Sequence, residues 1–176
     1  MVSSLRIFAL SFAAGTAVSV ASLACDNPNP GVPVGSYAVT SALSENSCGS
    51  GVAPSDPGNF DVTISNSDGV YYWFPDTGGS SVEGKINSAR TVSSSEVVAD
   101  NVDGTEAGAG PCTMQRSDTL TYTMGTGAVP ASLTGSYSSV FSTASGATCT
   151  DQLATHGGAY AALPCTVTYS LSGALQ

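Results

Sequence analysis

Residues 165–172 read CTVTYSLS, and this stretch alternates strictly between apolar and polar side chains. In a β-strand, Cys165, Val167, Tyr169 and Leu171 would share one face, and the threonines and serines between them would share the other. Such a two-residue period is typical of a strand that packs one face against a core and exposes the other to water. The stretch therefore predicts a strand with one dry face.

The same alternation recurs upstream, for example in residues 60–65 (FDVTIS) and 119–124 (TLTYTM). Turn signals such as Ser67-Asp68-Gly69 separate the runs. Strands are expected at residues 35–44, 59–66, 69–75, 80–87, 90–99, 111–124, 131–142 and 163–174. No interval between them has the length of a crossover helix, which excludes a parallel sheet. The predicted fold is all-β, with about eight antiparallel strands in an up-and-down barrel and a β-sandwich as the alternative.

The chain has five cysteines: Cys25, Cys48, Cys112, Cys149 and Cys165. In an up-and-down order the last four lie at one end of the barrel, because two of them follow a strand and two open one. Closure of the barrel sets the last strand beside the first, which favours the disulfides Cys48–Cys165 and Cys112–Cys149. Pairing of Cys149 with Cys165 inside their own loop is the alternative. A metal site is not expected, because the chain has no Cys-x-x-Cys spacing and a single histidine.

The amino-terminal segment has the layout of an export signal. Arg6 precedes an uncharged run, residues 7–24, which ends in small residues. Glycine, threonine and several serines make this run a poor membrane-spanning helix, so removal of residues 1–24 is favoured over a retained span. Export implies an oxidising compartment, in which four of the five cysteines can pair and Cys25 is left over.

Ser22-Leu23-Ala24-Cys25 resembles the lipobox of bacterial lipoproteins, whose cysteine becomes the first residue and receives a diacylglyceryl group on its sulfur. The family usually has leucine at the position of Ser22. The resemblance implies lipid attachment at Cys25 and a membrane as partner, since stable anchoring takes about two acyl chains. The alternative is a disulfide from Cys25 to another cysteine or to a second chain. Asp26 resembles an inner-membrane retention signal of some bacteria.

Residues 25–35 carry three prolines and are expected to form a stiff spacer of up to roughly 30 Å, at about 3.1 Å per residue. Residues 36–176 have the size of one domain. The expected location is the bacterial cell envelope, with a soluble secreted protein as the alternative. The formal net charge of -9 leaves no basic patch, which excludes nucleic acid as a partner and is typical of a soluble surface.

No motif indicates catalysis, and neither an enzyme activity nor a cofactor is expected. A nucleophile needs an activating base, and outside the signal the chain offers only His156 and Lys85, without a Gly-x-Ser-x-Gly elbow. The acidic residues Asp100, Asp103 and Glu106 lie in a glycine-rich segment that we interpret as an exposed loop, and its spacing does not fit an EF-hand. A hydrolase that uses loop carboxylates is the least favoured hypothesis.

Two features suggest binding. In VYYWF, residues 70–74, we expect Val70, Tyr72 and Phe74 to face the core, so that Tyr71 and Trp73 project outward and stack on a carbohydrate or a partner protein, unless a loop covers them. Strict alternation also places Arg116 and Asp118 on the apolar face of their strand. Because burial of charge is costly, a bulge that turns this pair outward at the rim is favoured over an interior pair. An interior Arg116 would bind an acidic ligand.

A closed eight-stranded meander resembles the lipocalin type of barrel, whose interior is filled by side chains or holds one small ligand. Gly35-Ser36-Tyr37 is similar to the Gly-x-Trp sequence that opens lipocalins, with tyrosine in place of tryptophan. Many large residues are predicted to point inward, so a packed interior is favoured over a cavity. The expected function is a structural or binding role in a non-catalytic cell-envelope domain, and a lipocalin-like carrier is the alternative.

Overall fold

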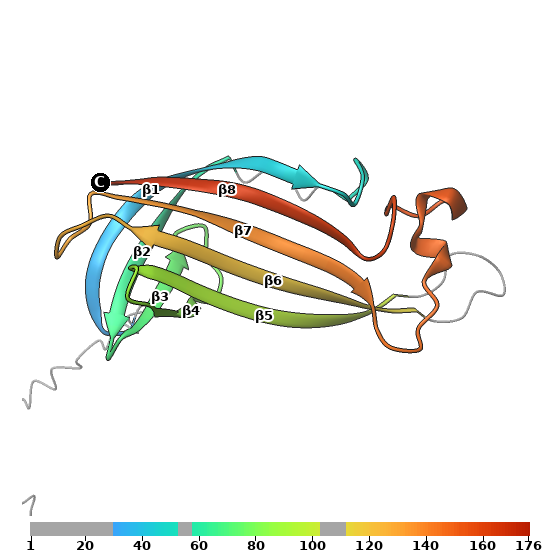
Figure 1. The fold of residues 1–176 in the computed structure, drawn as a ribbon, viewed down its shortest axis with the longest axis horizontal. Coiled ribbons are helices and arrows are strands. Elements are labelled where there is room, and N and C mark those ends of the chain that lie inside the picture. The colour runs from blue at the N-terminus through green and yellow to red at the C-terminus, as the bar shows by residue number, and fades with distance from the viewer. Residues whose placement is uncertain (1–29, 53–57, 103–111) are drawn as a thin grey trace, which may run out of the picture.

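The computed structural model describes residues 30–52, 58–102 and 112–176 of the chain. Each strand pairs antiparallel with the next, and the last pairs with the first, so the sheet closes into an up-and-down barrel (Figure 1). The predicted barrel is confirmed, and the sandwich alternative is wrong. Its eight strands are β1 (Val32–Asn46), β2 (Asn59–Ser67), β3 (Val70–Pro75), β4 (Val82–Ile86), β5 (Thr91–Val102), β6 (Cys112–Met124), β7 (Ser132–Thr143) and β8 (Cys165–Leu175).

The first strand starts earlier than the sequence predicts. β1 begins at Val32, and Val32 and Pro33, which we assigned to the spacer, already pair with β2. Pro33 is tolerated there because the ladder shifts its register between Pro33 and Gly35, and such irregularities release a residue from regular pairing.

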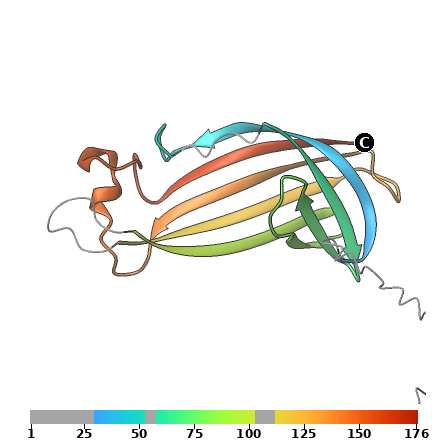
Figure 2. The ribbon, with the colours of Figure 1, turned by 180° about the vertical axis from the view of Figure 1, so that it is seen from behind.

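The strands differ in length, and this difference shapes the barrel. β2, β3 and β4 contain 9, 6 and 5 residues, whereas β1 and β5–β8 contain 11 to 15. The pairing of β4 with β5 comprises Lys85 with Ser93 and Ile86 with Val92. Both ribbon views show the long strands running well past the short ones as a curved sheet (Figures 1 and 2). We call this part, residues 94–102 of β5 with the neighbouring parts of β6, β7, β8 and β1, the strand extension.

The other end of the barrel is filled with side chains, and we call it the packed end. Its inward-facing residues Tyr37, Ile64, Tyr122 and Leu133 belong to one buried cluster. The hydroxyl of Tyr37 donates a hydrogen bond of 2.9 Å to the carbonyl oxygen of Pro130. Nearby, Arg90 donates from Nε to the carbonyl of Met124 at 3.4 Å and from Nη2 to that of Gly127 at 3.2 Å. Tyr37 and Arg90 thus satisfy three carbonyl groups at this end of the barrel.

Both predicted disulfides are present, and both lie at the free end of the strand extension. The long-loop bridge, Cys48–Cys165, has a sequence separation of 117, and the short-loop bridge, Cys112–Cys149, has one of 37. Cys149 and Cys165, one from each bridge, flank a segment that contains two short 3₁₀ turns, η1 (Thr150–Gln152) and η2 (Ala154–His156). Disulfides persist in oxidising compartments, so this pair indicates an extracytoplasmic environment. A helix long and apolar enough to cross a bilayer does not occur among the described residues.

Candidate ligand-binding cavity

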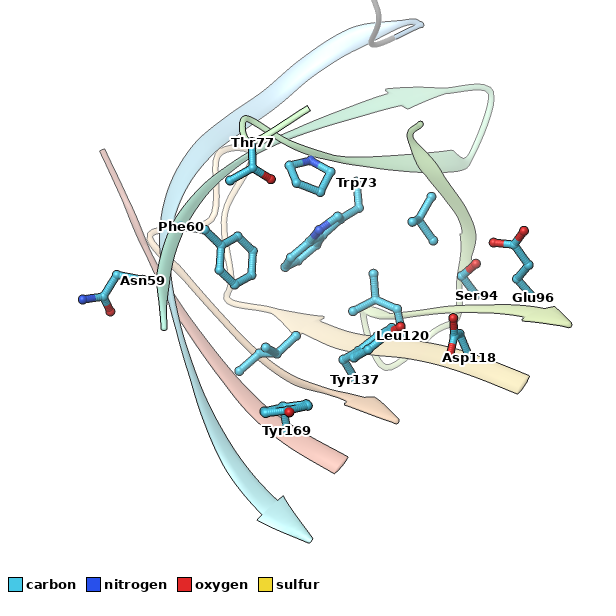
Figure 3. A pocket seen from close by; sticks show the side chains of 13 residues that line it. Asn59, Phe60, Trp73, Thr77, Ser94, Glu96, Asp118, Leu120, Tyr137 and Tyr169 are labelled. Carbon is cyan, nitrogen blue, oxygen red and sulfur yellow. The ribbon is translucent and has the colours of Figure 1, made fainter. Parts of the chain in front are cut away.

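A cavity of about 620 Å³ lies inside the barrel, where β2–β4 end and the strand extension begins (Figure 3). Its volume falls within the roughly 300–1,000 Å³ of small-molecule sites. Most of its lining is apolar or aromatic, and its polar residues lie near the ends of β2 and β3 and on the long strands β5 and β6. The lining residues are Asn59, Phe60, Trp73, Pro75, Thr77, Val82, Ser94, Glu96, Asp118, Leu120, Tyr137, Tyr169 and Leu171.

Trp73 forms the centre of the aromatic lining. It pairs with Ile64 across the β2–β3 ladder, and Ile64 is fully buried on the inward face, so the Trp73 side chain also points inward. The indole is 4% exposed, and its ring centroid lies 6.5 Å from that of Phe60 and 5.0 Å from that of Tyr122. These separations are typical of packed aromatic pairs.

The predicted outward orientation of Tyr71 and Trp73 is therefore wrong. Both residues lie on the inward face of β3, where Tyr71 packs against the main core cluster. Val70, Tyr72 and Phe74 lie on the outer face and are half-buried. Since β3 carries aromatic residues on both faces, the alternation could not decide which face points inward, and the register with β2 does.

Glu96 and Asp118 form one side of the cavity, which we call the acidic wall. The two residues face each other directly in the β5–β6 ladder (Figure 3). Asp118 accepts hydrogen bonds from Arg116 Nε at 2.9 Å and from Ser139 Oγ at 2.7 Å. Glu96 is exposed, and neither a hydrogen bond nor an ion pair links it to another described residue. The acidic wall thus has one carboxylate that is compensated by a cation and one that is not.

The β5–β6 ladder keeps its register from Thr91–Thr123 to Val102–Cys112, so the predicted bulge at Arg116 is wrong. Arg116 and Asp118 both face inward as an ion pair, with 43% and 13% of their side chains exposed. The cost of burying charge did not prevent this arrangement, because water still reaches the inward face of the strand extension. The charge cost that argued for a bulge applies only to a dry interior.

Tyr137 brings a hydroxyl to the same region. Burial raises the pKa of Tyr137 above its usual value; hydrogen bonding with Ser139 lowers it, and the negative charge of Asp118 raises it further. The Tyr137 hydroxyl is therefore a neutral group at physiological pH, and it can both donate and accept a hydrogen bond.

Several residues that the sequence singled out are not part of the described cavity lining. Cys25, Asp103 and Glu106 lie outside the described residues, and Asp100 belongs to the end of β5 and not to a loop. His156 is exposed in η2 and does not line the cavity. Within residues 30–52, 58–102 and 112–176, no three His, Cys, Asp or Glu side chains are placed to hold a metal ion. No family model, curated protein or solved structure matches the chain.

Sequence reasoning missed Glu96 and the two residues of β8 in the lining, Tyr169 and Leu171, as parts of a site. The signal was available, because Tyr169 and Leu171 lie on the dry face of CTVTYSLS. What could not be seen was that the interior is incompletely filled. Tyr72 and Phe74, which we expected to face inward, lie on the outer face, and Tyr71 and Trp73 take their place inside. A count of inward rings therefore does not reveal the cavity.

Proposed function

We propose that this protein binds a small, largely apolar molecule in the barrel cavity and carries out no catalysis. The observation that supports this proposal is the cavity of about 620 Å³ beside Trp73. Apolar pockets with a few polar groups are the usual form of small-molecule sites, and the mouth of a β-barrel is a common place for them. This favours the carrier hypothesis over a purely structural role. A partner surface built on Tyr71 and Trp73 is not proposed, because both lie on the inward face.

Isothermal titration calorimetry with decanol, a neutral apolar probe, tests the proposal. Ser94 lines the cavity, whereas its neighbour Ser95 is exposed on the outer face of the same strand. Ser94→Phe should narrow the cavity and weaken decanol binding, and Ser95→Phe should bind decanol as the parent protein does. Circular dichroism would establish that both variants keep the fold.

The parent protein supplies an independent signal. Trp73 is the only tryptophan of the chain and lines the cavity, so its fluorescence should change as decanol binds. Absence of decanol binding to the parent protein, or equal binding by both phenylalanine variants, would overturn the proposal.

We also propose that the domain is anchored to a bacterial cell envelope through lipid on Cys25. The lipobox-like Ser22-Leu23-Ala24-Cys25 supports this, and so does the pairing of the other four cysteines with one another in two disulfides. The mass of the protein purified from the membranes of a bacterial host should show a diacylglyceryl group on an amino-terminal Cys25. Cys25→Ser should abolish the added mass of the diacylglyceryl group. An unmodified Cys25 in the mature protein would refute the anchor.

A further inference from the structure

We infer that the ligand is an amphipathic organic cation, with an apolar body in the cavity and a protonated amine at the acidic wall. The inference rests on the proposed function, because it assigns a chemical class to the molecule that occupies the same cavity. Three observations support it: the charges in the lining are negative, the nearby Arg116 is already paired with Asp118, and aromatic rings surround the cavity at Trp73.

The lining contains two carboxylates, Glu96 and Asp118, and neither lysine, arginine nor histidine. Like charges placed directly opposite each other in an antiparallel ladder repel each other, and these two residues are such a pair. Arg116 compensates Asp118 at 2.9 Å, which leaves the charge of Glu96 uncompensated by any described residue. A bound cation beside Glu96 would remove this repulsion.

An anionic ligand lacks a comparable partner among the described residues that line the cavity. Arg116 is the basic residue nearest to the acidic wall, but its Nε is engaged by Asp118 and it does not line the cavity. Further along the inward face of β5, Asp100 adds another negative charge opposite Met114. The four inward-facing charges of β5 and β6 are Glu96, Asp100, Asp118 and Arg116, and they sum to one positive minus three negative, or -2. The earlier idea that Arg116 binds an acidic ligand is therefore not the one we propose.

The aromatic lining suits a cation as well as an apolar chain. The face of a tryptophan, tyrosine or phenylalanine ring attracts cations, and tryptophan does so most strongly. Trp73, Tyr137 and Tyr169 all contribute to the lining. Burial raises the pKa of Tyr137, so this ring stays uncharged at neutral pH. The formal net charge of -9 further favours the approach of a cation over that of an anion.

Three probes with the same apolar chain isolate the effect of the head group: decylamine, decanol and decanoate. Their affinities would be measured by calorimetry and by Trp73 fluorescence at low salt. Decylamine should bind about fivefold more tightly than decanol, as expected for one partly exposed ion pair, and decanoate should bind more weakly than decanol. The advantage of decylamine should shrink at high salt, because exposed charges are screened.

Glu96→Gln should bring the affinity ratio of decylamine to decanol close to one. Glu83→Gln is the matched control, because Glu83 is an exposed residue of β4 that does not line the cavity, and this variant removes the same charge from the outer surface. The control should keep the ratio of the parent protein. Both variants have the same net charge, so a difference between them reports the position of the carboxylate and not the overall charge.

The results separate the two proposals. If none of the three probes binds, the proposed function fails. If decanol binds but decylamine has no advantage, or if decanoate binds most tightly, the cavity is a binding site and the inference of a cationic ligand is wrong. Equal ratios in Glu96→Gln and Glu83→Gln would also overturn the inference, because the preference would then come from overall charge alone.

Discussion

Removal of one hydroxyl group should change the stability of the packed end in opposite directions at two positions. Tyr37 and Tyr122 are both buried there, with 0% and 2% of the residue exposed. The Tyr37 hydroxyl donates to the carbonyl of Pro130 at 2.9 Å, whereas the Tyr122 hydroxyl has no hydrogen-bond partner among the described residues. A buried polar group without a partner costs about 1–3 kcal/mol, and a typical hydrogen bond contributes about 0.5–1.5 kcal/mol.

Tyr122→Phe should therefore raise the free energy of unfolding by about 1 kcal/mol, and Tyr37→Phe should lower it by about 1 kcal/mol. The two substitutions remove the same atom from the same apolar cluster, so each controls for the loss of size in the other. Urea denaturation, followed by circular dichroism with the disulfides intact, measures both changes. Equal destabilisation by the two variants would refute the reasoning, because it would mean that the Tyr122 hydroxyl has a bonding partner in the folded protein.

The effect of Tyr122 on the free energy of unfolding should also depend on pH. Burial raises the pKa of Tyr122, and the neighbouring Tyr71 and Tyr37 add to the rise. In the unfolded chain a tyrosine ionises at about pH 10. Above this pH the unfolded state binds fewer protons than the folded state, so the free energy of unfolding falls by up to about 1.4 kcal/mol per pH unit for such a group. Below pH 10 Tyr122 has no such effect. Tyr122→Phe should make the alkaline decline shallower, and an unchanged slope above pH 10 would contradict the assignment.

Two further predictions concern the disulfides and the aromatic lining. Loop-closure entropy for separations of 117 and 37 predicts that the long-loop bridge stabilises the fold by about 5 kcal/mol and the short-loop bridge by about 4 kcal/mol. Replacing both cysteines of the long-loop bridge by alanine should therefore lower the urea midpoint of unfolding more than the same change in the short-loop bridge. The opposite order would show that loop length does not govern their contributions. Trp73→Ala should lower the free energy of unfolding by about 3–5 kcal/mol, because Trp73 is 4% exposed; urea denaturation followed by circular dichroism measures this change. A decrease below about 1 kcal/mol is typical of a surface residue and would contradict the buried position of Trp73.

The alternation of apolar and polar residues was sufficient to predict the barrel. Stretches such as CTVTYSLS indicate which side chains share the inward face, and the intervals between strands are too short for a parallel crossover, so consecutive strands pair antiparallel. The strand order then favoured the disulfides that the structure has, because Cys48 and Cys165 lie where the last strand joins the first, although the pairing of Cys149 with Cys165 stayed open. These predictions succeeded because they depend on the period of the pattern and on chain order, both of which are local properties of the sequence.

The cavity could not be predicted, because it depends on register and on strand length. In β3 either face could have been the inward one, and only the pairing of Trp73 with Ile64 decides. In β6 the alternation correctly placed Arg116 inward, but we argued against it from the cost of burying charge. That cost is small where the long strands have no neighbours to enclose them, so the inward face there is wet. The sequence already predicted shorter strands at 59–66, 69–75 and 80–87 than at 111–124, but it did not predict that the long strands leave part of their inward face open to water.

The short ladder between β4 and β5 makes one seam in the wall of the barrel weaker than the others. It comprises the pairs Lys85–Ser93 and Ile86–Val92, whereas β5 and β6 pair along their whole lengths. Amide hydrogens near this seam should exchange with solvent sooner than those of β6 and β7, since local opening breaks fewer bonds there. Val82 and Ser94 line the cavity from the two sides of the seam, so its opening would widen the cavity and leave the packed end intact. A guest molecule would then enter through the side of the barrel, and its rate of entry would follow the rate of amide exchange.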